Sequence, residues 1–422
     1  MSMKYYDGLD ETLYRQTLAN GLTVLVAPKP GFSRKMAYFV TDFGSVHTDF
    51  RLEGQEYHVP AGIAHFLEHK MFDLPNRDVS AEFAALGANV NAFTSFDITA
   101  YYFSCTENFE KSLELLLEFV STPYFTQESV EKELGIIDQE IGMYEDSPDS
   151  RVFDNLMASM YRKHPIRVPI LGSRASLREI TPALLHACHR GFYTPKNMVL
   201  CVVGDVEPQE VCQIADKVLG KEEKPAAEKI RQWHETMDCD SEAVTCAMEV
   251  AMPSFQLGFK CESVDSGMAA IRQEVVGDLA AEVLFGESST LYLRLYEQGL
   301  IDSSFGGGFE SVDGCALLTC GGDSEEAETV RQAILQRAQQ LCTEEISQQD
   351  FLRMKRSALG RRIRDLDSFD STCFRLCAYH FSGFDYFNFP SVYADVTWQQ
   401  VQAFLLAVVQ PRRCALSVVI PK

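Results

Sequence analysis

Two histidines and a glutamate lie close together in the segment His65-Phe-Leu-Glu-His69. A helix turns by about 100° per residue, so His65 and His69 would share one helical face, one turn apart. Two imidazoles at this spacing can bind a single divalent metal ion. Glu68 falls on the same side, where its carboxylate can reach a water molecule in the site. This order, His-x-x-Glu-His, is the inverted form of a zinc peptidase signature.

The residues around this segment decide between an enclosed helix and the alternative, a polar cluster on the surface. Residues 61–64 and 66–67 are apolar apart from one glycine, and residues 73–75, Asp-Leu-Pro, end the run. Such a helix is too apolar to be fully solvated. The histidine pair is therefore expected to face an enclosed cleft.

A catalytic zinc site needs a third protein ligand, and the acidic stretch at residues 129–144 offers one. Glu133 and Glu140 are seven residues apart, two helical turns, and so share one face. Next to them Leu134, Ile137 and Ile141 form an apolar stripe, which predicts an amphipathic helix. Glu140 fits the role of ligand, with Glu133 behind it. The alternative is an ordinary amphipathic helix with solvated acids.

With these segments the chain resembles the pitrilysin/insulinase family of inverted zinc metallopeptidases, which includes mitochondrial processing peptidase. It is most similar to the short bacterial members, which have about half the length of pitrilysin. The similarity follows one order along the first half of the chain, through residues 18–24, 62–72, 91–95, 133–148, 164–172, 192–198 and 203–205.

The resemblance implies a role for each residue of the motifs. His65, His69 and Glu140 are expected to bind one Zn²⁺ per chain, Glu68 to act as the general base, and Glu133 to be a supporting acid. It also implies a zinc-dependent endopeptidase acting on peptides or unfolded chains.

The same resemblance places the substrate on the edge of a strand. Asn91 and Ala92 are expected to lie on this edge and to pair with the peptide backbone by β-augmentation.

One departure from the family pattern affects the expected assembly. Active members complete the site with an Arg and a Tyr, seven residues apart, from the second half or from a partner subunit. Here the corresponding positions hold Leu295 and Asp302, and a shift by one residue gives Arg294 and Ile301. A related half-length subunit is therefore expected to supply the pair in a hetero-oligomer. The competing interpretation is a non-catalytic structural or assembly subunit.

Composition sets limits on partners and location. The net charge of −22 argues against binding of nucleic acid or anionic membranes. No apolar run is long enough for a membrane span, and residues 1–8 lack the apolar region of a secretory signal. Thirteen cysteines without a Cys-x-x-Cys pair indicate reduced thiols, so a cytoplasmic location is expected.

An internal repeat predicts the domain organisation. Residues 195–204 align without gaps with residues 411–420, an offset of 216 residues, about half the chain. We expect a zinc-bearing domain at residues 1–219, a polar linker at 220–240 and a homologous domain at 241–422. The helix expected at residues 278–285 matches the metal helix in position but has no histidine, so the second domain should lack a metal.

Strand and helix patterns alternate without a strict βαβ rhythm, which predicts an α+β fold with largely antiparallel sheets. Asn20-Gly21 marks a hairpin. Strands are expected at residues 37–43 and 100–105, and helices at 110–120 and 327–341. The family fold agrees, since each domain is an antiparallel sheet covered by helices. Three weaker motifs are better explained by structure than by chemistry: Gly306-Gly-Gly308 by a strand or turn, His186 and His189 by a solvated helix end, and Cys373 and Cys377 by helix packing.

Overall fold

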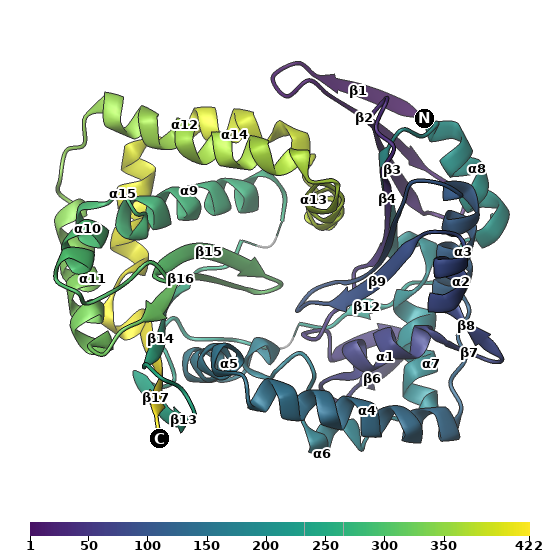
Figure 1. Ribbon diagram of the computed structural model, residues 1–422, viewed down its shortest axis with the longest axis horizontal. Coiled ribbons are helices and arrows are strands. Elements are labelled where there is room, and N and C mark those ends of the chain that lie inside the picture. Colours follow the sequence, from purple (N-terminus) through teal and green to yellow (C-terminus); the bar gives the residue numbers. More distant parts are fainter. Residues whose placement is uncertain (232, 265) are drawn as a thin grey trace. The chain divides into compact units, whose positions relative to one another are not determined.

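The computed structural model describes residues 1–231, 233–264 and 266–422 (Figure 1). The chain forms two compact units. The first unit consists of Met1–Gln139, Pro169–Arg231 and Ile363–Asn388, and the second of Glu140–Val168, Gln232–Arg362 and Phe389–Lys422. Each unit therefore combines segments from both halves of the sequence. The predicted division at residues 1–219, 220–240 and 241–422 stays a prediction, and Gln232 in that linker lies outside the described residues.

A seven-stranded sheet forms the centre of the first unit, in the order β1-β2-β3-β11-β4-β10-β9. All neighbouring strands are antiparallel except β3 and β11. Every residue of β11 is buried, as expected for a strand of apolar residues covered on both faces. β9 is the last strand in the order. The strands are β1 Ser2–Tyr6, β2 Glu11–Thr17, β3 Thr23–Pro28, β4 Lys35–Thr41, β9 Asn89–Thr94, β10 Thr99–Cys105 and β11 Met198–Gly204.

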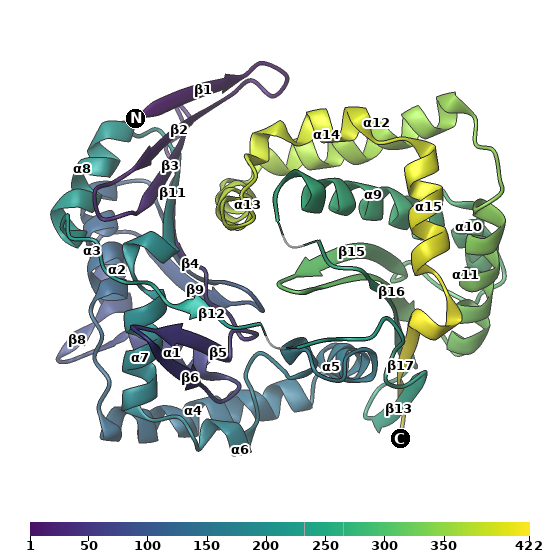
Figure 2. The same ribbon diagram turned by 180° about the vertical axis from the view of Figure 1, so that it is seen from behind.

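Helices cover both faces of this sheet. α3 and α8 lie on one face, whereas α13 lies on the other, against β11 and β4 (Figures 1 and 2). The helices of this unit are α1 Ile63–Met71, α2 Val79–Ala85, α3 Phe109–Ser121, α6 Arg174–Leu177, α7 Pro182–Phe192, α8 Pro208–Leu219 and α13 Phe369–Phe381. α4, Gln127–Glu145, begins in the first unit and ends in the second. The short strands are β5 Asp49–Leu52, β6 Gln55–His58, β7 Asp73–Leu74, β8 Arg77–Asp78 and β12 Glu228–Lys229.

The second unit repeats the core of this sheet. Its five strands follow the order β13-β17-β14-β16-β15, which matches β3-β11-β4-β10-β9 strand for strand. In both sheets the second strand is parallel to the first and antiparallel to the third. The strands are β13 Ala243–Met248, β14 Ser254–Cys261, β15 Gly306–Val312, β16 Cys315–Asp323 and β17 Cys414–Pro421. The predicted α+β fold with two homologous, largely antiparallel domains is confirmed.

The helix that covers the second face of each sheet comes from the other half of the sequence. α5, which precedes residue 219, packs on β14 and β17 of the second unit, just as α13 packs on β4 and β11 of the first. Gly258 of β14 makes room for α5, because a Cβ there would lie 2.4 Å from the sulfur of Met160. The helices of the second unit are α5 Pro148–Met160, α9 Gly267–Phe285, α10 Thr290–Glu297, α11 Ala327–Leu341, α12 Gln348–Arg364, α14 Phe389–Asp395 and α15 Trp398–Val408, of which α12 ends in the first unit.

Local signals in the sequence account for many of these elements. At the predicted hairpin, Gly21 adopts φ +91° between β2 and β3. α5 begins after Ser147, whose side chain accepts a hydrogen bond from Ser150 N, with Pro148 in the first turn. The described part of the chain contains no helix that is both long and apolar enough to cross a membrane.

Candidate metal centre

Helix α1 carries the two histidines and the glutamate of the motif. His65 and Glu68 are buried, and His69 is a quarter exposed at its side chain. The helix starts at Gly62, which has φ +92°. A Cβ at Gly62 would lie 2.4 Å from Leu171 O, and one at Gly172 would lie 2.4 Å from Ala61 O. This close backbone contact fixes where α1 begins and hence where its side chains point.

His65, His69 and Glu140 form the candidate metal centre. One ligand atom from each lies within 4.8 Å of the other two, and no other such cluster occurs among the residues that the structure describes. The two imidazole rings lie 4.6 Å apart, centre to centre. Ligand atoms of a tetrahedral zinc site are roughly 3.4 Å apart when each bond is about 2.1 Å, so small adjustments would close this cluster around an ion. Two imidazoles and a carboxylate are also a known donor set for catalytic zinc.

Burial keeps His65 in the form that can bind a metal. Burial away from water is the main cause that lowers the pKa of His65 to about 3, and the nearby His69 is the second cause. The imidazole is therefore neutral near pH 7, with a lone pair available for coordination.

Behind His69 lies a chain of charged side chains on α1 and α4. His69 Nδ1 is 3.0 Å from Glu133 Oε1, and Glu133 Oε2 is 3.8 Å from Lys70 Nζ. A carboxylate only accepts hydrogen bonds, so Nδ1 carries the hydrogen and Nε2 is the ring atom that could bind a metal. Lys70 has a fully buried side chain and also contacts Asp73 and Ser129 O. Sequence reasoning missed Lys70, although a lysine within an apolar helix was a usable signal.

Glu68 contacts β9, the strand that carries Asn91 and Ala92. Thr94 Oγ1, at the end of β9, donates a hydrogen bond of 2.6 Å to Glu68 Oε2. Tyr101 and Tyr193 lie deeper, with their hydroxyls 2.9 Å apart. Burial, with contributions from the negative Glu68, raises the pKa of both tyrosines, so they stay protonated. Thr94 belongs to a motif that the sequence singled out, but no role followed from its position there.

Asn91 and Ala92 lie on β9, the last strand of the sheet order. On one side β9 pairs with β10, with Ala92 opposite Tyr101. Ala92 N donates a hydrogen bond of 2.9 Å to the side chain of Asn91; Asn91 is exposed and Ala92 is half-buried. The strand therefore presents an open edge at the two residues that were expected to meet the substrate.

The counterpart regions of the second unit carry no comparable chemistry. α9 contains the predicted helix and has no histidine. Leu295 is buried in α10, and Asp302 accepts hydrogen bonds from Ser304 in the following turn. The three glycines 306–308 form the start of β15, a strand as predicted.

The remaining motifs have structural explanations. His189 is buried and its ring contacts Val120 O at 3.1 Å, so the expectation of a solvated helix end is wrong for this residue, while His186 is exposed. The two histidines differ because His189 contacts the backbone of α3 through Val120 O, whereas the side chain of His186 is exposed to solvent. Cys373 and Cys377 are buried in α13, where they pack rather than bind a metal.

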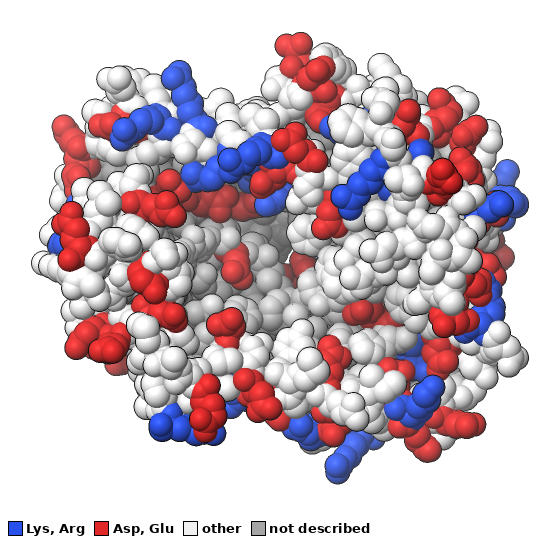
Figure 3. All heavy atoms as spheres, in the orientation of Figure 1, with Lys and Arg blue, Asp and Glu red and all other residues white. Residues whose placement is uncertain are grey.

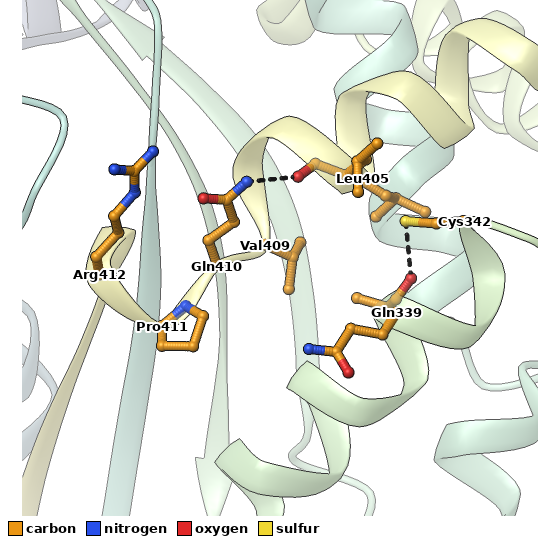
Figure 4. A pocket seen from close by; sticks show the side chains of 9 residues that line it. Gln339, Cys342, Leu405, Val409, Gln410, Pro411 and Arg412 are labelled. Carbon is orange, nitrogen blue, oxygen red and sulfur yellow. Dashed lines mark hydrogen bonds between the residues drawn. The ribbon is translucent and has the colours of Figure 1, made fainter.

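A pocket of about 460 Å³ lies between α11 and α15 in the second unit (Figure 4). Most of its lining is apolar, and its polar side chains include Gln410, which donates a hydrogen bond to Leu406 O. No acid or histidine lines it.

Two sheets of one topology, with an inverted His-x-x-Glu-His helix on one of them, define a class of metallopeptidase-like proteins. Comparison with known families agrees: residues 54–174 match the model described as Insulinase (Peptidase family M16), and residues 179–358 match the one described as Peptidase M16 inactive domain. A Bacillus subtilis protein named Uncharacterized zinc protease YmfH is 38% identical over 99% of this chain and 98% of its own length. This chain belongs to the M16 (pitrilysin/insulinase) family, and the expected half-length bacterial form is confirmed.

Solved structures extend the comparison. A crystal structure of an M16-like peptidase from Alicyclobacillus acidocaldarius has 32% identity and a TM-score of 0.94, covering 98% of this chain and 99% of that one. A Pseudomonas fluorescens structure described as a peptidase M16 inactive domain has 18% identity and a TM-score of 0.79 over 97% and 98%, which shows a common fold only.

The names of the curated relatives imply Zn²⁺ as the cofactor. The donor set of His65, His69 and Glu140 fits this ion, both in the types of its ligand atoms and in their spacing.

Proposed function

We propose that this chain is the zinc-bearing subunit of an endopeptidase that cleaves peptides and unfolded chains. The observation that carries the proposal is the cluster of His65 and His69 of α1 with Glu140 of α4, on the helix that also carries the buried Glu68. When bound, Zn²⁺ supplies a Lewis acid that polarises a carbonyl and brings the pKa of water towards neutrality.

The side chains of this chain have distinct roles in the proposed reaction. Glu68 accepts the proton of the attacking water and delivers it to the leaving amine. Glu133 holds His69 in one orientation and tautomer through Nδ1. Asn91 and Ala92 on the open edge of β9 pair with the peptide backbone, which aligns the scissile bond.

The proposal includes a second, related half-length subunit. Leu295 and Asp302 occupy the positions where the family resemblance expects an Arg and a Tyr. A partner that provides this pair would complete the site. The thirteen free thiols support work in a reducing compartment such as the cytoplasm.

The test is the substitution Glu68→Gln in the zinc-loaded chain, assayed together with a related half-length M16 chain that carries the Arg and the Tyr. The amide keeps the shape of the side chain but cannot accept the proton, so hydrolysis of a quenched fluorescent peptide should fall by about a hundred- to ten-thousandfold. Zinc content should stay at the wild-type level. Glu128→Gln, an exposed acid on α4, is the control and should behave as the wild type.

The second candidate function is a non-catalytic assembly subunit. The match of residues 179–358 to an inactive-domain model and the missing Arg and Tyr favour it. Under this alternative, Glu68→Gln would change nothing measurable, because wild type and variant would both fail to cleave peptides with the partner present.

A further inference from the structure

The carboxylate of Glu68 has one close contact with the substrate-edge strand. Thr94 Oγ1 lies 2.6 Å from Glu68 Oε2, a length typical of a hydroxyl that donates to a carboxylate. A threonine hydroxyl has a single hydrogen, and Thr99 Oγ1, at 3.4 Å, lies farther from Thr94 Oγ1 than Glu68 Oε2 does. The hydrogen of Thr94 is therefore directed at Glu68.

Thr94 is itself held firmly. It forms the closing pair of the β9–β10 hairpin with Thr99. Ser95 N donates to Ile98 O at 2.8 Å across the turn, and Thr99 Oγ1 donates to Phe43 O at 2.8 Å. The hairpin therefore fixes the backbone of Thr94, and a hydroxyl on a fixed backbone can impose a direction on the group that accepts its hydrogen bond.

The last torsion of a glutamate side chain has broad, weakly defined minima, so a hydrogen bond to the Glu68 carboxylate contributes to its orientation. A single strong hydrogen bond selects one orientation of the carboxylate plane. The donor lies on the same strand as Asn91 and Ala92, and on the same face of the strand as Ala92, two residues away. One rigid strand would thus align both the peptide and the base.

We infer that Thr94 is the positioning residue for the catalytic base: its hydroxyl holds the Glu68 carboxylate in the orientation needed for proton transfer. This inference rests on the proposed function of Glu68. Thr94 does not itself exchange a proton with substrate.

The experiment compares Thr94→Val, which keeps the shape and removes the donor, with Thr94→Ser, which keeps the hydroxyl. Thr17→Val is the matched control, because Thr17 closes the β2–β3 hairpin of the same sheet with Thr23. A hydrogen bond to a charged group is worth on the order of a ten- to a hundredfold effect, so kcat of Thr94→Val should fall by that factor while KM and zinc content stay constant. Thr94→Ser and Thr17→Val should stay close to wild type.

A double substitution separates positioning from a general effect on the site. In the Glu68→Gln background, Thr94→Val should cause no further loss, since the oriented base is already absent. A full additional loss in that background would overturn the inference, as would wild-type kcat in Thr94→Val.

A readout without turnover separates this inference from the proposed function. The infrared carboxylate band of Glu68, assigned by difference from Glu68→Gln, should shift in zinc-loaded Thr94→Val and not in Thr17→Val. If wild type cleaves no peptide but the band shifts, the proposed function falls and the positioning role of Thr94 stands. An unshifted band would overturn the positioning role in either case.

Discussion

His69 contacts the other candidate metal ligands on one side and the carboxylate of Glu133 on the other. Its ring lies beside His65 and near Glu140 on the side of the candidate metal centre, and its Nδ1 contacts Glu133. In the proposed site, replacing the ring would remove a metal ligand, whereas replacing Glu133 would remove only the group that orients this ligand. The two residues should therefore differ in how strongly they affect zinc binding.

We expect His69→Ala to abolish stoichiometric zinc binding and Glu133→Gln to weaken it by roughly ten- to a hundredfold, the usual effect of losing an outer hydrogen-bond partner. Equilibrium competition with a chelator, followed by elemental analysis, measures both. His58→Ala, which changes an exposed histidine of β6, should bind one zinc per chain. Stoichiometric zinc in His69→Ala would show that the ligand assignment is wrong.

Lys70 has a charged group inside the protein, balanced by Glu133 and Asp73. Lys70→Ala leaves the buried Glu133 without this cation, and breaking a buried ion pair from one side typically costs about 3 kcal/mol or more. We expect this loss in the free energy of unfolding of the zinc-free protein, measured with urea. Lys4→Ala, which removes the exposed partner of Asp385, should cost less than about 1 kcal/mol. Equal effects of the two would mean that Lys70 does not depend on its acidic partners.

At the scale of elements, the position of α1 depends on the close contact between two glycines. Gly62 and Gly172 both have positive φ, and each leaves no space for a Cβ against the backbone of the other segment. An alanine at either position would be strained at positive φ, and its Cβ would clash with a backbone oxygen, which cannot move aside as the end of a flexible side chain can.

We expect Gly62→Ala and Gly172→Ala each to lower the free energy of unfolding by about 1–3 kcal/mol. The double variant should lose less than the sum, because both changes disturb one contact. Urea unfolding measures this, with Gly31→Ala as a comparison: Gly31 has positive φ but nothing near its missing Cβ. A loss in Gly31→Ala as large as in Gly62→Ala would assign the whole effect to φ and none to the close contact.

At the scale of the whole molecule, the chain has acidic side chains spread over both units on the face shown in Figure 3, in agreement with its net charge of −22. Such a surface favours basic peptides as ligands and disfavours self-association at low salt. Specific pairing with another chain therefore needs basic side chains on the partner. An arginine supplied by a partner subunit would be one such group.

The isolated chain should bind zinc fully and yet cleave peptides weakly. A donor aimed at the developing oxyanion is worth roughly 2.7–4 kcal/mol, so the missing Arg and Tyr should cost about a hundredfold or more in kcat. Adding the related half-length chain should restore turnover, and replacing the Arg or Tyr of that chain should abolish the restoration. Full activity of the isolated chain at high dilution would contradict the need for a partner.

The sequence by itself determined the features that depend on local spacing. The helical repeat brings His65, Glu68 and His69 to one face, and Asn20-Gly21 sets a hairpin, because both follow from short-range geometry. The repeat between residues 195–204 and 411–420 also predicted two sheets of one kind, since equal patterns of buried residues favour equal strands. The class of the site and of the fold were accessible in this way.

Only the tertiary structure decided which distant residues meet. The contacts of Glu68 with Thr94 and of Lys70 with Glu133 join residues far apart in the chain, and no periodic pattern encodes such pairs. The same holds for the exchange of α5 and α13 between the two sheets: each helix covers a face in the unit formed mainly by the other half. Amphipathic patterns predict that a face is buried but do not say against which partner, because burial of apolar surface is non-directional.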